Sequence, residues 1–248
     1  MTVITPDWLE LREGADAAAR SAELAEGLAR HLEGGPLEVH DLGGGSGAMG
    51  RWLAPRLPGP QHWVVHDRDP DLLALAVADA PPGVTVEARR SDVTRLAPED
   101  LAGASLVTTS ALLDLLTAGE LVRMLRACAG RPLLLALTVV GRVTLSPADP
   151  LDARIGAAFN AHQRRGGRLG PDAVAAAIDE LGACTVRPSP WRLDATHADL
   201  IAEWFDGWVA AACEQEPTLA AEAGAYRERR LAQKLAVTVD HADLLVLP

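Results

Sequence analysis

The chain has 248 residues, of which 48% are hydrophobic, and carries a formal net charge of −11 at neutral pH. This composition predicts a folded protein with a sizeable core and argues against a disordered chain. The negative charge argues against a nucleic-acid partner, because phosphate backbones are bound mainly through Lys and Arg. The longest apolar run, 132–140, is too short to cross a membrane, which takes roughly 18 residues, so no membrane association is expected.

The N-terminus lacks the charged and apolar segments of a secretory signal. Three widely spaced cysteines, Cys128, Cys184 and Cys213, form no CxxC pair, and their odd number is typical of reduced thiols. We therefore expect a cytoplasmic protein. His62 and His66 share one side of a predicted strand without a third ligand nearby, so no metal site is expected.

The first 35 residues predict one or two helices over 7–33, which end at Gly34-Gly35-Pro36. Strands and helices then alternate up to residue 140. Strands are expected at 37–42, 61–66, 84–89, 105–109 and 133–139, and helices at 48–57, 70–80 and 118–128. This β-α repeat is typical of a doubly wound, mostly parallel sheet with helices on both faces, so the fold class is α/β.

After residue 141 the alternation breaks. We expect a strand at 184–187, a last strand at 236–247 with a candidate turn at Asp240-His241, and helices at 151–163, 172–181 and, on either side of Pro217, within 197–235. Because no linker or repeat is visible, the prediction is a single domain, 1–248. It divides into a helical cap (1–35), a cofactor-binding core (36–140) and substrate-side helices with a terminal hairpin (141–248).

The segment 37–50, LEVHDLGGGSGAMG, carries the strongest functional pattern. It predicts a buried strand, a glycine-rich turn at 43–47 and a helix that begins near Ala48. Glycines at such a turn permit positive φ and the close approach of a ligand. The following helix points free N–H groups and its positive dipole end at the same place. The segment is therefore expected to bind a small polar molecule.

Two patterns fit this turn. Residues 45–50 match GxGxxG, the dinucleotide-binding fingerprint, with Asp67 about 20 residues further on. Residues 41–47 also read D-x-G-x-G-x-G. The carboxylate of Asp41, two residues before the first glycine, repels a pyrophosphate but attracts a ligand that carries an ammonium and a sulfonium. Asp41 therefore favours the second pattern.

On these residues the chain resembles the class I S-adenosylmethionine-dependent methyltransferases over at least 37–140. The resemblance implies a Rossmann-like sheet of seven strands with N-terminal helices and an antiparallel final hairpin. It also implies S-adenosyl-L-methionine as the cofactor and S-adenosyl-L-homocysteine as its product. By resemblance, Asp41 lies near the amino-acid end of the cofactor, Asp67 binds the ribose hydroxyls and Asp92 contacts the adenine amino group. The cofactor-binding candidates are Asp41, Gly43, Gly44, Gly45, Gly47, Asp67, Arg68, Ser91, Asp92, Val93, Ser110 and Arg12.

Arg12 is a candidate because it stands on the predicted helices before the first strand, from which it could reach the cofactor carboxylate. Arg20 stands on the same predicted helices and could do the same. The acceptor is expected beyond the ends of the fourth and fifth strands. The tetrad D/N-P-P-Y/F/W of amino-methyltransferases is absent there and 108–111 reads TTSA, which argues against a DNA-base or protein-glutamine acceptor.

The candidate catalytic residues are Asp114 and His162, either of which could orient or deprotonate an acceptor. The candidate acceptor contacts are Asn160, Arg165 and Trp191. Each of these residues also has a purely structural interpretation: a helix-cap carboxylate, an exposed histidine, a solvated arginine cluster or a core tryptophan.

The sequence thus predicts methyl transfer from S-adenosylmethionine to a nitrogen or oxygen atom of a small molecule, by a monomer or a homodimer. Such a reaction needs mainly positioning, with a general base only for a protonated acceptor. Two alternatives stay open at this point. One is an NAD(P)-dependent oxidoreductase, and the other is a non-catalytic module that binds the cofactor or a partner on the same fold.

Overall fold

The computed structural model describes residues 5–32 and 34–248, so residue 33, at the end of the predicted helical segment, lies outside it. Its helices are α1 (Pro6–Ala19), α2 (Ala22–His31), α3 (Ala48–Leu53), α4 (Pro70–Ala78), α5 (Ala118–Ala127), α6 (Asp152–Gln163), α7 (Ala173–Leu181), α8 (Ala198–Gln215) and α9 (Ala220–Leu231). Its strands are β1 (Leu37–Leu42), β2 (Gln61–Asp67), β3 (Val84–Arg90), β4 (Leu106–Ser110), β5 (Leu133–Ser146), β6 (Thr185–Pro188), β7 (Trp191–Leu193) and β8 (Ala236–Val246).

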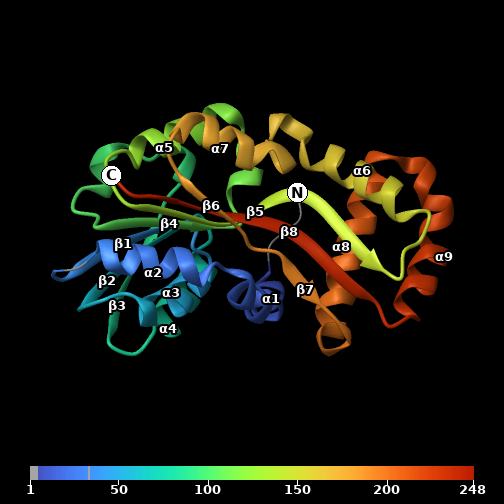
Figure 1. Cartoon of the computed structure of the whole chain (residues 1–248), viewed down its shortest axis with the longest axis horizontal. Coiled ribbons are helices and arrows are strands. Elements are labelled where there is room, and N and C mark those ends of the chain that lie inside the picture. The colour runs from blue at the N-terminus through green and yellow to red at the C-terminus, as the bar shows by residue number, and fades with distance from the viewer. Residues whose placement is uncertain (1–4, 33) are drawn as a thin grey trace.

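All strands belong to one sheet with the order β3-β2-β1-β4-β5-β8-β6, while β7 pairs with β8 (Figure 1). Neighbouring strands from β3 to β5 are parallel, and β8 is antiparallel to β5, β6 and β7. The predicted mostly parallel sheet is confirmed, with eight strands instead of seven because β7 is an additional short strand. The strand order reverses between β1 and β4, which is where doubly wound sheets bind their ligands.

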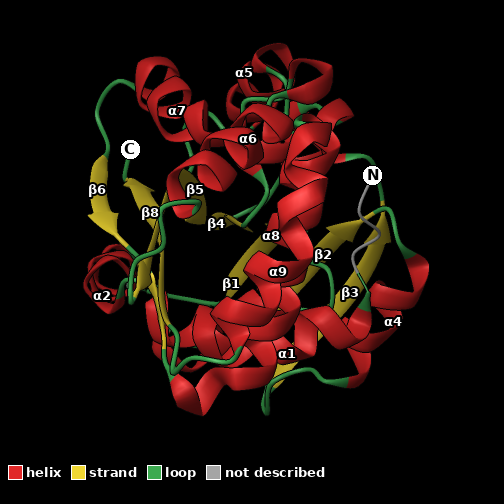
Figure 2. Ribbon diagram, turned by 90° about the vertical axis from the view of Figure 1, so that its right-hand side faces the viewer, coloured by secondary structure: helices red, strands yellow, loops and turns green. Residues whose placement is uncertain are grey.

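Helices cover both faces of the sheet (Figure 2). On one face, α2 and α3 pack their apolar residues against β1 and β4 around Val39, Trp52 and Leu106. On the other face, α5 and α7 pack around Leu42 and Leu135. Val39 and Leu42 lie an odd number of residues apart on β1 and therefore point to opposite faces. Both faces are apolar, as expected for a buried parallel sheet.

A second apolar core lies over the far ends of β5 and β8, where α6, α8 and α9 gather (Figure 1). The predicted strand 133–139 is too short, because β5 continues to Ser146 and keeps pairing with β8. The predicted turn at Asp240-His241 is wrong, because β8 runs through it without interruption. Asp240 forms an ion pair with Arg142 of β5 and His241 is in register with Val139, so both residues are held within the ladder.

The antiparallel pairing of the expected final hairpin is present between β6 and β8, with α8 and α9 inserted between the two strands. The predicted helix 48–57 is shorter than expected. It ends at Leu53 and continues as a 3₁₀ turn over Ala54–Arg56, because Pro55 lacks the N–H that an α-helix needs. None of the helices in the described part of the chain is long and apolar enough to cross a lipid bilayer.

Side-chain caps position the N-terminal helices over the sheet. Thr5 accepts a hydrogen bond from Trp8 N at the start of α1, and Ser21 accepts one from Leu24 N at the start of α2. Asp243 of β8 accepts from Ser21 N and from Leu137 N, both at 2.7 Å. Leu137 sits at a bulge in β5 with φ of 53°. Asp243 therefore fixes the junction of α1 and α2 against the centre of the sheet.

Candidate functional site

The glycine turn follows β1 and is held from below by the end of β2. The carbonyl of His66 accepts hydrogen bonds from Gly43 N at 2.8 Å and Gly44 N at 3.1 Å. Asp67 Oδ2 accepts from Gly45 N at 2.9 Å. Gly43, Gly45 and Gly47 have positive φ, and Gly47 precedes the first residue of α3. The turn is thus a backbone cradle of the kind that the sequence predicts.

Asp41 lies at the end of β1, directly behind this cradle. Its side chain is fully buried, and its Oδ1 accepts a hydrogen bond from Thr108 Oγ1 at 2.8 Å. Its Oδ2 has no hydrogen-bond partner, and a Cβ at Gly44 would lie only 2.5 Å from it. Burial raises the pKa of Asp41 to about 6, against the lowering effects of Thr108 and Arg20. A buried carboxylate oxygen without a donor indicates a missing cationic or hydrogen-bonding ligand.

Arg20, at the junction of α1 and α2, is a second buried charged residue near Asp41 with unused hydrogen-bonding atoms. The side chain is 5% exposed, and its Nη2 donates to Ser110 Oγ at 3.2 Å, while Nε and Nη1 have no acceptor. Burial lowers its pKa, and the carboxylates of Asp16, Asp41 and Asp243 partly oppose that effect. A buried guanidinium with unused donors indicates a site for an anionic group.

The carboxylate of Asp67, at the end of β2, is held by the backbone. Asp67 Oδ1 accepts from Asp69 N at 3.0 Å, in addition to the bond from Gly45 N to Oδ2. Ser91 N donates to the carbonyl of Asp67 at 2.8 Å, and Ser91 Oγ lies 3.0 Å from His66 Nδ1. A carboxylate oxygen accepts two hydrogen bonds, so Asp67 keeps acceptor capacity for hydroxyl groups.

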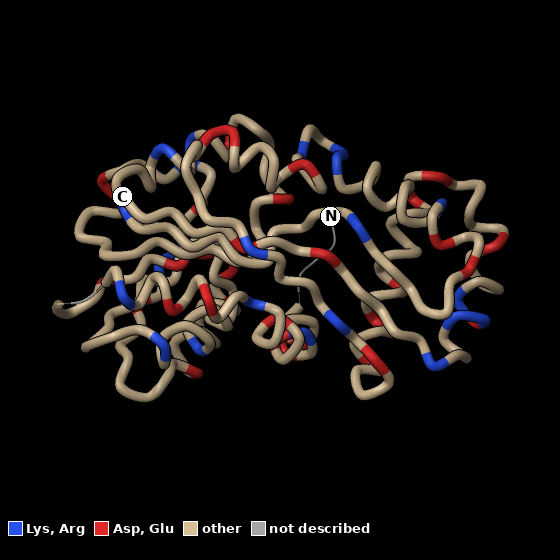
Figure 3. The backbone as a smooth tube through the Cα atoms, in the orientation of Figure 1, with Lys and Arg blue, Asp and Glu red and all other residues tan. Residues whose placement is uncertain are grey.

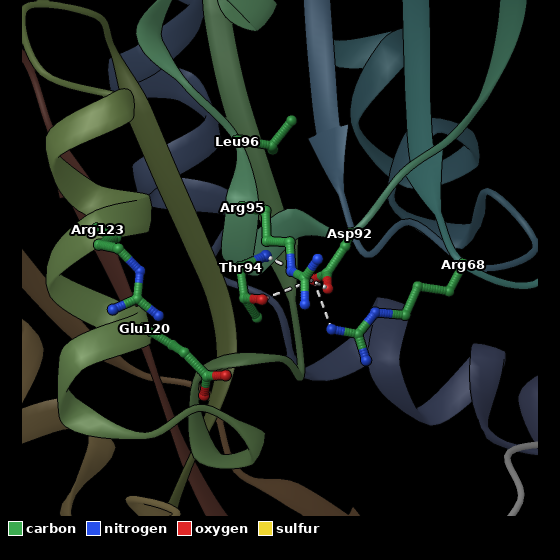
Figure 4. Close-up of a pocket in the computed structure, with 7 residues that line it drawn as sticks. All are labelled: Arg68, Asp92, Thr94, Arg95, Leu96, Glu120 and Arg123. Carbon is green, nitrogen blue, oxygen red and sulfur yellow. Dashed lines mark hydrogen bonds and ion pairs between the residues drawn. The ribbon is translucent and has the colours of Figure 1, made fainter.

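Asp92 caps the short 3₁₀ turn that follows β3 and forms an ion pair with Arg68 (Figure 4). Its Oδ1 accepts from Arg68 and from Thr94, whereas its Oδ2 has only Arg95 at 3.5 Å. These hydrogen bonds hold the pKa of Asp92 at about 2. A cavity of about 620 Å³ opens here, lined by Arg68, Asp92, Thr94, Arg95, Leu96, Glu120 and Arg123. The residue after Asp92 in the chain, Val93, has a buried side chain.

Arg12 of α1 is engaged within the protein. Its guanidinium makes two hydrogen bonds to Asp16, at 3.0 and 3.1 Å, and lies over the rings of Trp8 and Trp191. Trp191 is buried and donates from Nε1 to the same carboxylate, Asp16, at 2.9 Å. Of the two arginines that the sequence suggested for the cofactor carboxylate, Arg20 is the one with buried donors that have no acceptor.

Asp114 stands in the 3₁₀ turn after β4, two residues beyond Leu112, whose side chain covers Gly43. It is 6% exposed, and its Oδ1 has no hydrogen-bond partner. Burial raises its pKa, while the charges of Arg12 and Arg168 oppose the shift. Asp114 thus combines a place at the end of β4 with an unused buried oxygen, as a group that orients or deprotonates an acceptor requires.

The remaining acceptor-side candidates lie on and after α6 and are bound to neighbouring elements. His162 Nε2 is 3.0 Å from Glu214 of α8, and its buried Nδ1 has no partner. Asn160 donates to the carbonyl of Gly141 at 2.7 Å, and Arg165 donates to Gln215 at 2.7 Å. Their roles toward an acceptor stay predictions.

Two contributors to the site carried no clear signal in the sequence. In the sequence His66 forms only an improbable metal pair with His62, yet its carbonyl binds the glycine turn and its ring binds Ser91 in the turn after β3. Thr108 stands where the amino-methyltransferase tetrad is absent, yet it binds Asp41. The alignment of β1 with β4 places Asp41 opposite Thr108, so a correct sheet order would have identified this pair.

Acidic and basic residues are scattered along the backbone, and both signs occur in most parts of the molecule (Figure 3). In the part of the chain that the structure describes, no group of three or more His, Cys, Asp or Glu side chains is placed to hold a metal ion.

No protein-family model and no curated protein sequence matches this chain significantly. Solved structures do match. A proposed methyltransferase from Bacillus halodurans is 15% identical with a TM-score of 0.51, covering 91% of this chain and 97% of its own. A cyclopropane synthase from Mycobacterium tuberculosis is 13% identical with a TM-score of 0.50, covering 97% and 94%. A methyltransferase from Geobacter sulfurreducens, bound to S-adenosyl-L-homocysteine, is 16% identical over the whole of both chains with a TM-score of 0.45.

The likeness to the first two proteins extends over almost the whole chain. The chain therefore has the class I methyltransferase fold, as its motifs predict.

Proposed function

We propose that the protein transfers a methyl group from S-adenosyl-L-methionine to a nitrogen or oxygen atom of a small molecule. The observation that carries this proposal is a pair of buried, oppositely charged side chains near the glycine cradle whose polar atoms are only partly hydrogen-bonded. Asp41 Oδ2 lacks a donor, and Arg20 Nε and Nη1 lack acceptors. An α-amino acid group supplies an ammonium for the first and a carboxylate for the second, and methionine is the amino-acid part of this cofactor.

The other residues at the edge of the sheet fit the rest of the cofactor. Only glycine fits at position 44, because a Cβ there would lie 2.5 Å from Asp41 Oδ2 and 2.8 Å from Val65, so the backbone of the turn lies directly against the buried carboxylate. Asp67 has acceptor capacity left for ribose hydroxyls, and Asp92 Oδ2 has it for the adenine amino group. When bound, the cofactor supplies a methyl group that the sulfonium activates. The chain's own task is then to orient the reactants and exclude water.

The strand order favours this function over a dinucleotide-dependent oxidoreductase. The dinucleotide-binding Rossmann sheet has the order 3-2-1-4-5-6 with all strands parallel. Here the antiparallel β8 lies between β5 and β6. Asp41 adds an electrostatic argument, because its buried charge opposes a pyrophosphate at the glycine turn.

Asp114 is the group we assign to the acceptor, with His162 second. Its unused Oδ1 lies at the end of β4, and its raised pKa makes it a stronger base than an ordinary carboxylate. The small size of the acceptor is supported by the net charge of −11, which disfavours nucleic acid.

Calorimetric titration with S-adenosyl-L-homocysteine and, separately, with NADH tests this proposal. We expect S-adenosyl-L-homocysteine to bind with micromolar affinity and NADH not to bind. Asp41→Asn keeps the size of the side chain but removes its charge, and it should lower the affinity about 10- to 100-fold. Asp71→Asn, on the exposed first turn of α4, is the matched control and should bind normally. Binding of NADH alone would sink the proposal.

Asp114 separates an enzyme from a non-catalytic module. Asp114→Asn should leave the affinity for S-adenosyl-L-homocysteine within about twofold and reduce product formation with a panel of small amines, phenols and carboxylic acids by about 10²-fold or more. Absence of methyl transfer by the unmodified protein to every member of a broad panel, despite tight cofactor binding, would favour the non-catalytic module.

A further inference from the structure

Four hydrogen-bonded side chains cross β1, β2 and the end of β3. They lie next to the glycine turn (43–47) and the turn after β3 (91–95), which we call the cofactor loops. His40 Nε2 lies 2.9 Å from Glu38 Oε1, His40 Nδ1 lies 3.0 Å from His66 Nε2, and His66 Nδ1 lies 3.0 Å from Ser91 Oγ. We name these four residues the histidine relay. It begins at the start of β1 on a carboxylate that is 39% exposed, passes through two buried rings and ends in the turn after β3.

The carboxylate of Glu38 sets the direction of every hydrogen bond in the relay. An ionised carboxylate only accepts, so His40 donates from Nε2 and, as a neutral ring, accepts at Nδ1. His66 must then donate from Nε2 and accept at Nδ1, which leaves Ser91 Oγ as the donor to His66. Burial lowers the pKa of His40 and lowers that of His66 to about 4, so both rings are neutral near pH 7.

Charged groups on several elements face the two rings. They are Glu38 on β1, Glu87 and Arg89 on β3, Asp100 in the turn before β4 and Arg131 before β5. Among them only Glu38 is hydrogen-bonded to a ring of the relay. Glu87 instead bonds Arg89 and lies near the exposed His62.

His66 joins the relay to both cofactor loops. Its carbonyl accepts from Gly43 N and Gly44 N, and its ring accepts from Ser91 Oγ. The next residue, Asp67, binds Gly45 N through its carboxylate and Ser91 N through its carbonyl. The distance between the glycine turn and the turn after β3 is therefore set by the placement of these two residues.

We propose that the histidine relay is a positioning device for the cofactor, in which Glu38 orients His40 and His66, and His66 fixes the Ser91–Asp92 turn against the glycine cradle. The inference rests on the proposed function, because it takes Asp67 and Asp92 as cofactor contacts. Its distinctive consequence is an effect at a distance. Glu38 lies at the opposite end of β1 from the cradle, and its bonded partners are His40 and Ser105.

The test is Glu38→Gln, which keeps the shape of the side chain but presents either a donor or an acceptor to His40. The tautomers of both rings are then no longer fixed. We expect the affinity for S-adenosyl-L-homocysteine to fall about 3- to 10-fold, the loss of one oriented hydrogen bond. Glu87→Gln removes an equal charge from the neighbourhood of His66 without touching the relay, and it should bind as the unmodified protein does.

Ser91→Ala cuts the relay at its other end and should cost a similar factor. Because the two changes interrupt one chain, the double variant Glu38→Gln/Ser91→Ala should bind no more weakly than Ser91→Ala alone. If each substitution acted only on its own surroundings, the factors by which the two changes weaken binding would multiply instead. Equal affinities of Glu38→Gln and Glu87→Gln would overturn the proposal.

Nuclear magnetic resonance of ¹⁵N-labelled histidine tests the relay without cofactor. Both rings should be Nε2–H tautomers in the unmodified protein, and Glu38→Gln should shift the amide signals of Gly43, Gly44, Gly45 and Ser91. An Nδ1–H tautomer at either ring, or unchanged amide signals, would contradict the relay. Failure of the unmodified protein to bind S-adenosyl-L-homocysteine would contradict the proposed function, and these spectra would still decide the relay on its own.

Discussion

Arg20 is a buried guanidinium with more donors than nearby acceptors in the cofactor-free protein. Burying a charge costs free energy that a single hydrogen bond to Ser110 does not return. The charges of Asp16, Asp41 and Asp243 offset part of this cost, and an anionic group of a ligand would offset more of it. We therefore expect Arg20 to add little to the stability of the protein and to raise its affinity for a ligand with a carboxylate.

Arg20→Met tests whether Arg20 serves ligand affinity more than it serves stability. The methionine removes the burial cost of the guanidinium but also the positive charge opposite Asp41 and Asp243, so the two effects should leave the free energy of unfolding within about 1 kcal/mol of its original value. The affinity for S-adenosyl-L-homocysteine should fall about 10- to 100-fold, because a charge-assisted hydrogen bond is lost. Binding of 5′-methylthioadenosine, which lacks the amino-acid group, should not change. Arg56→Met is the matched control, since Arg56 lies over the same ring of Trp52 on the protein surface.

Asp41 should make cofactor binding depend on pH. Burial raises its pKa to about 6 in the free protein, and only the ionised form attracts the ammonium of the cofactor. The affinity for S-adenosyl-L-homocysteine should therefore be constant above pH 7 and fall up to tenfold per unit below pH 6. Asp41→Asn should bind weakly and lose this dependence. A flat profile from pH 7 to pH 5 in the unmodified protein would contradict the role of Asp41.

At the scale of elements, α1 is the cover of the glycine cradle. Arg51 of α3 donates to both oxygens of Glu13 on α1, at 2.7 and 2.6 Å, and to the carbonyl of Ser46 within the turn. The side chain of Leu9 lies where a Cβ at Gly45 would meet it at 3.5 Å. The ion pair between Glu13 and Arg51 therefore connects α1 to α3, the helix that follows the glycine turn.

Glu13→Gln should loosen this cover with little effect on overall stability. Partly exposed ion pairs contribute about 0–1 kcal/mol, so we expect faster hydrogen exchange in α1, a severalfold faster release of S-adenosyl-L-homocysteine and a nearly constant melting temperature. Glu10→Gln, on the exposed side of the same helix, is the control. Equal exchange rates in the two variants would show that the Glu13–Arg51 pair does not hold α1.

The parallel half of the sheet follows from the sequence because each strand there contains apolar or β-branched residues and begins shortly after a glycine or proline. The full length of β5 and the continuity of β8 through Asp240 do not, since Asp240 and Arg142 are polar and their ion pair joins residues far apart in the sequence. The same limit applies to the site. Asp41, Asp67 and Asp92 are marked by their positions at strand ends, whereas the choice of Arg20 over Arg12 depends on Asp16, which binds Arg12 across one helical turn.

For the molecule as a whole, buried ionisable groups act in opposite directions on stability in acid. His66 and His241 have their pKa lowered to about 4, so protons bind first to the unfolded chain, and stability is lost as pH falls from about 6.5 to 4. Asp41 has its pKa raised to about 6, so the folded protein binds that proton first and regains stability between pH 6 and about 4. His40 adds to the loss, and Asp114 and Asp243 reduce it.

Asp41, His66 and His241 each change the free energy of unfolding by about 1.4 kcal/mol per pH unit between pH 6 and pH 4. For these three groups alone, two histidines against one aspartate give a loss of about 1.4 kcal/mol per unit. Asp41→Asn removes the opposing group, so its loss should steepen to about 2.7 kcal/mol per unit, although this variant is the more stable one at pH 7. His241→Phe removes one histidine and should flatten the dependence. Urea unfolding at pH 6, 5 and 4.5 measures all three slopes, and equal slopes would mean that these groups do not titrate as their burial requires.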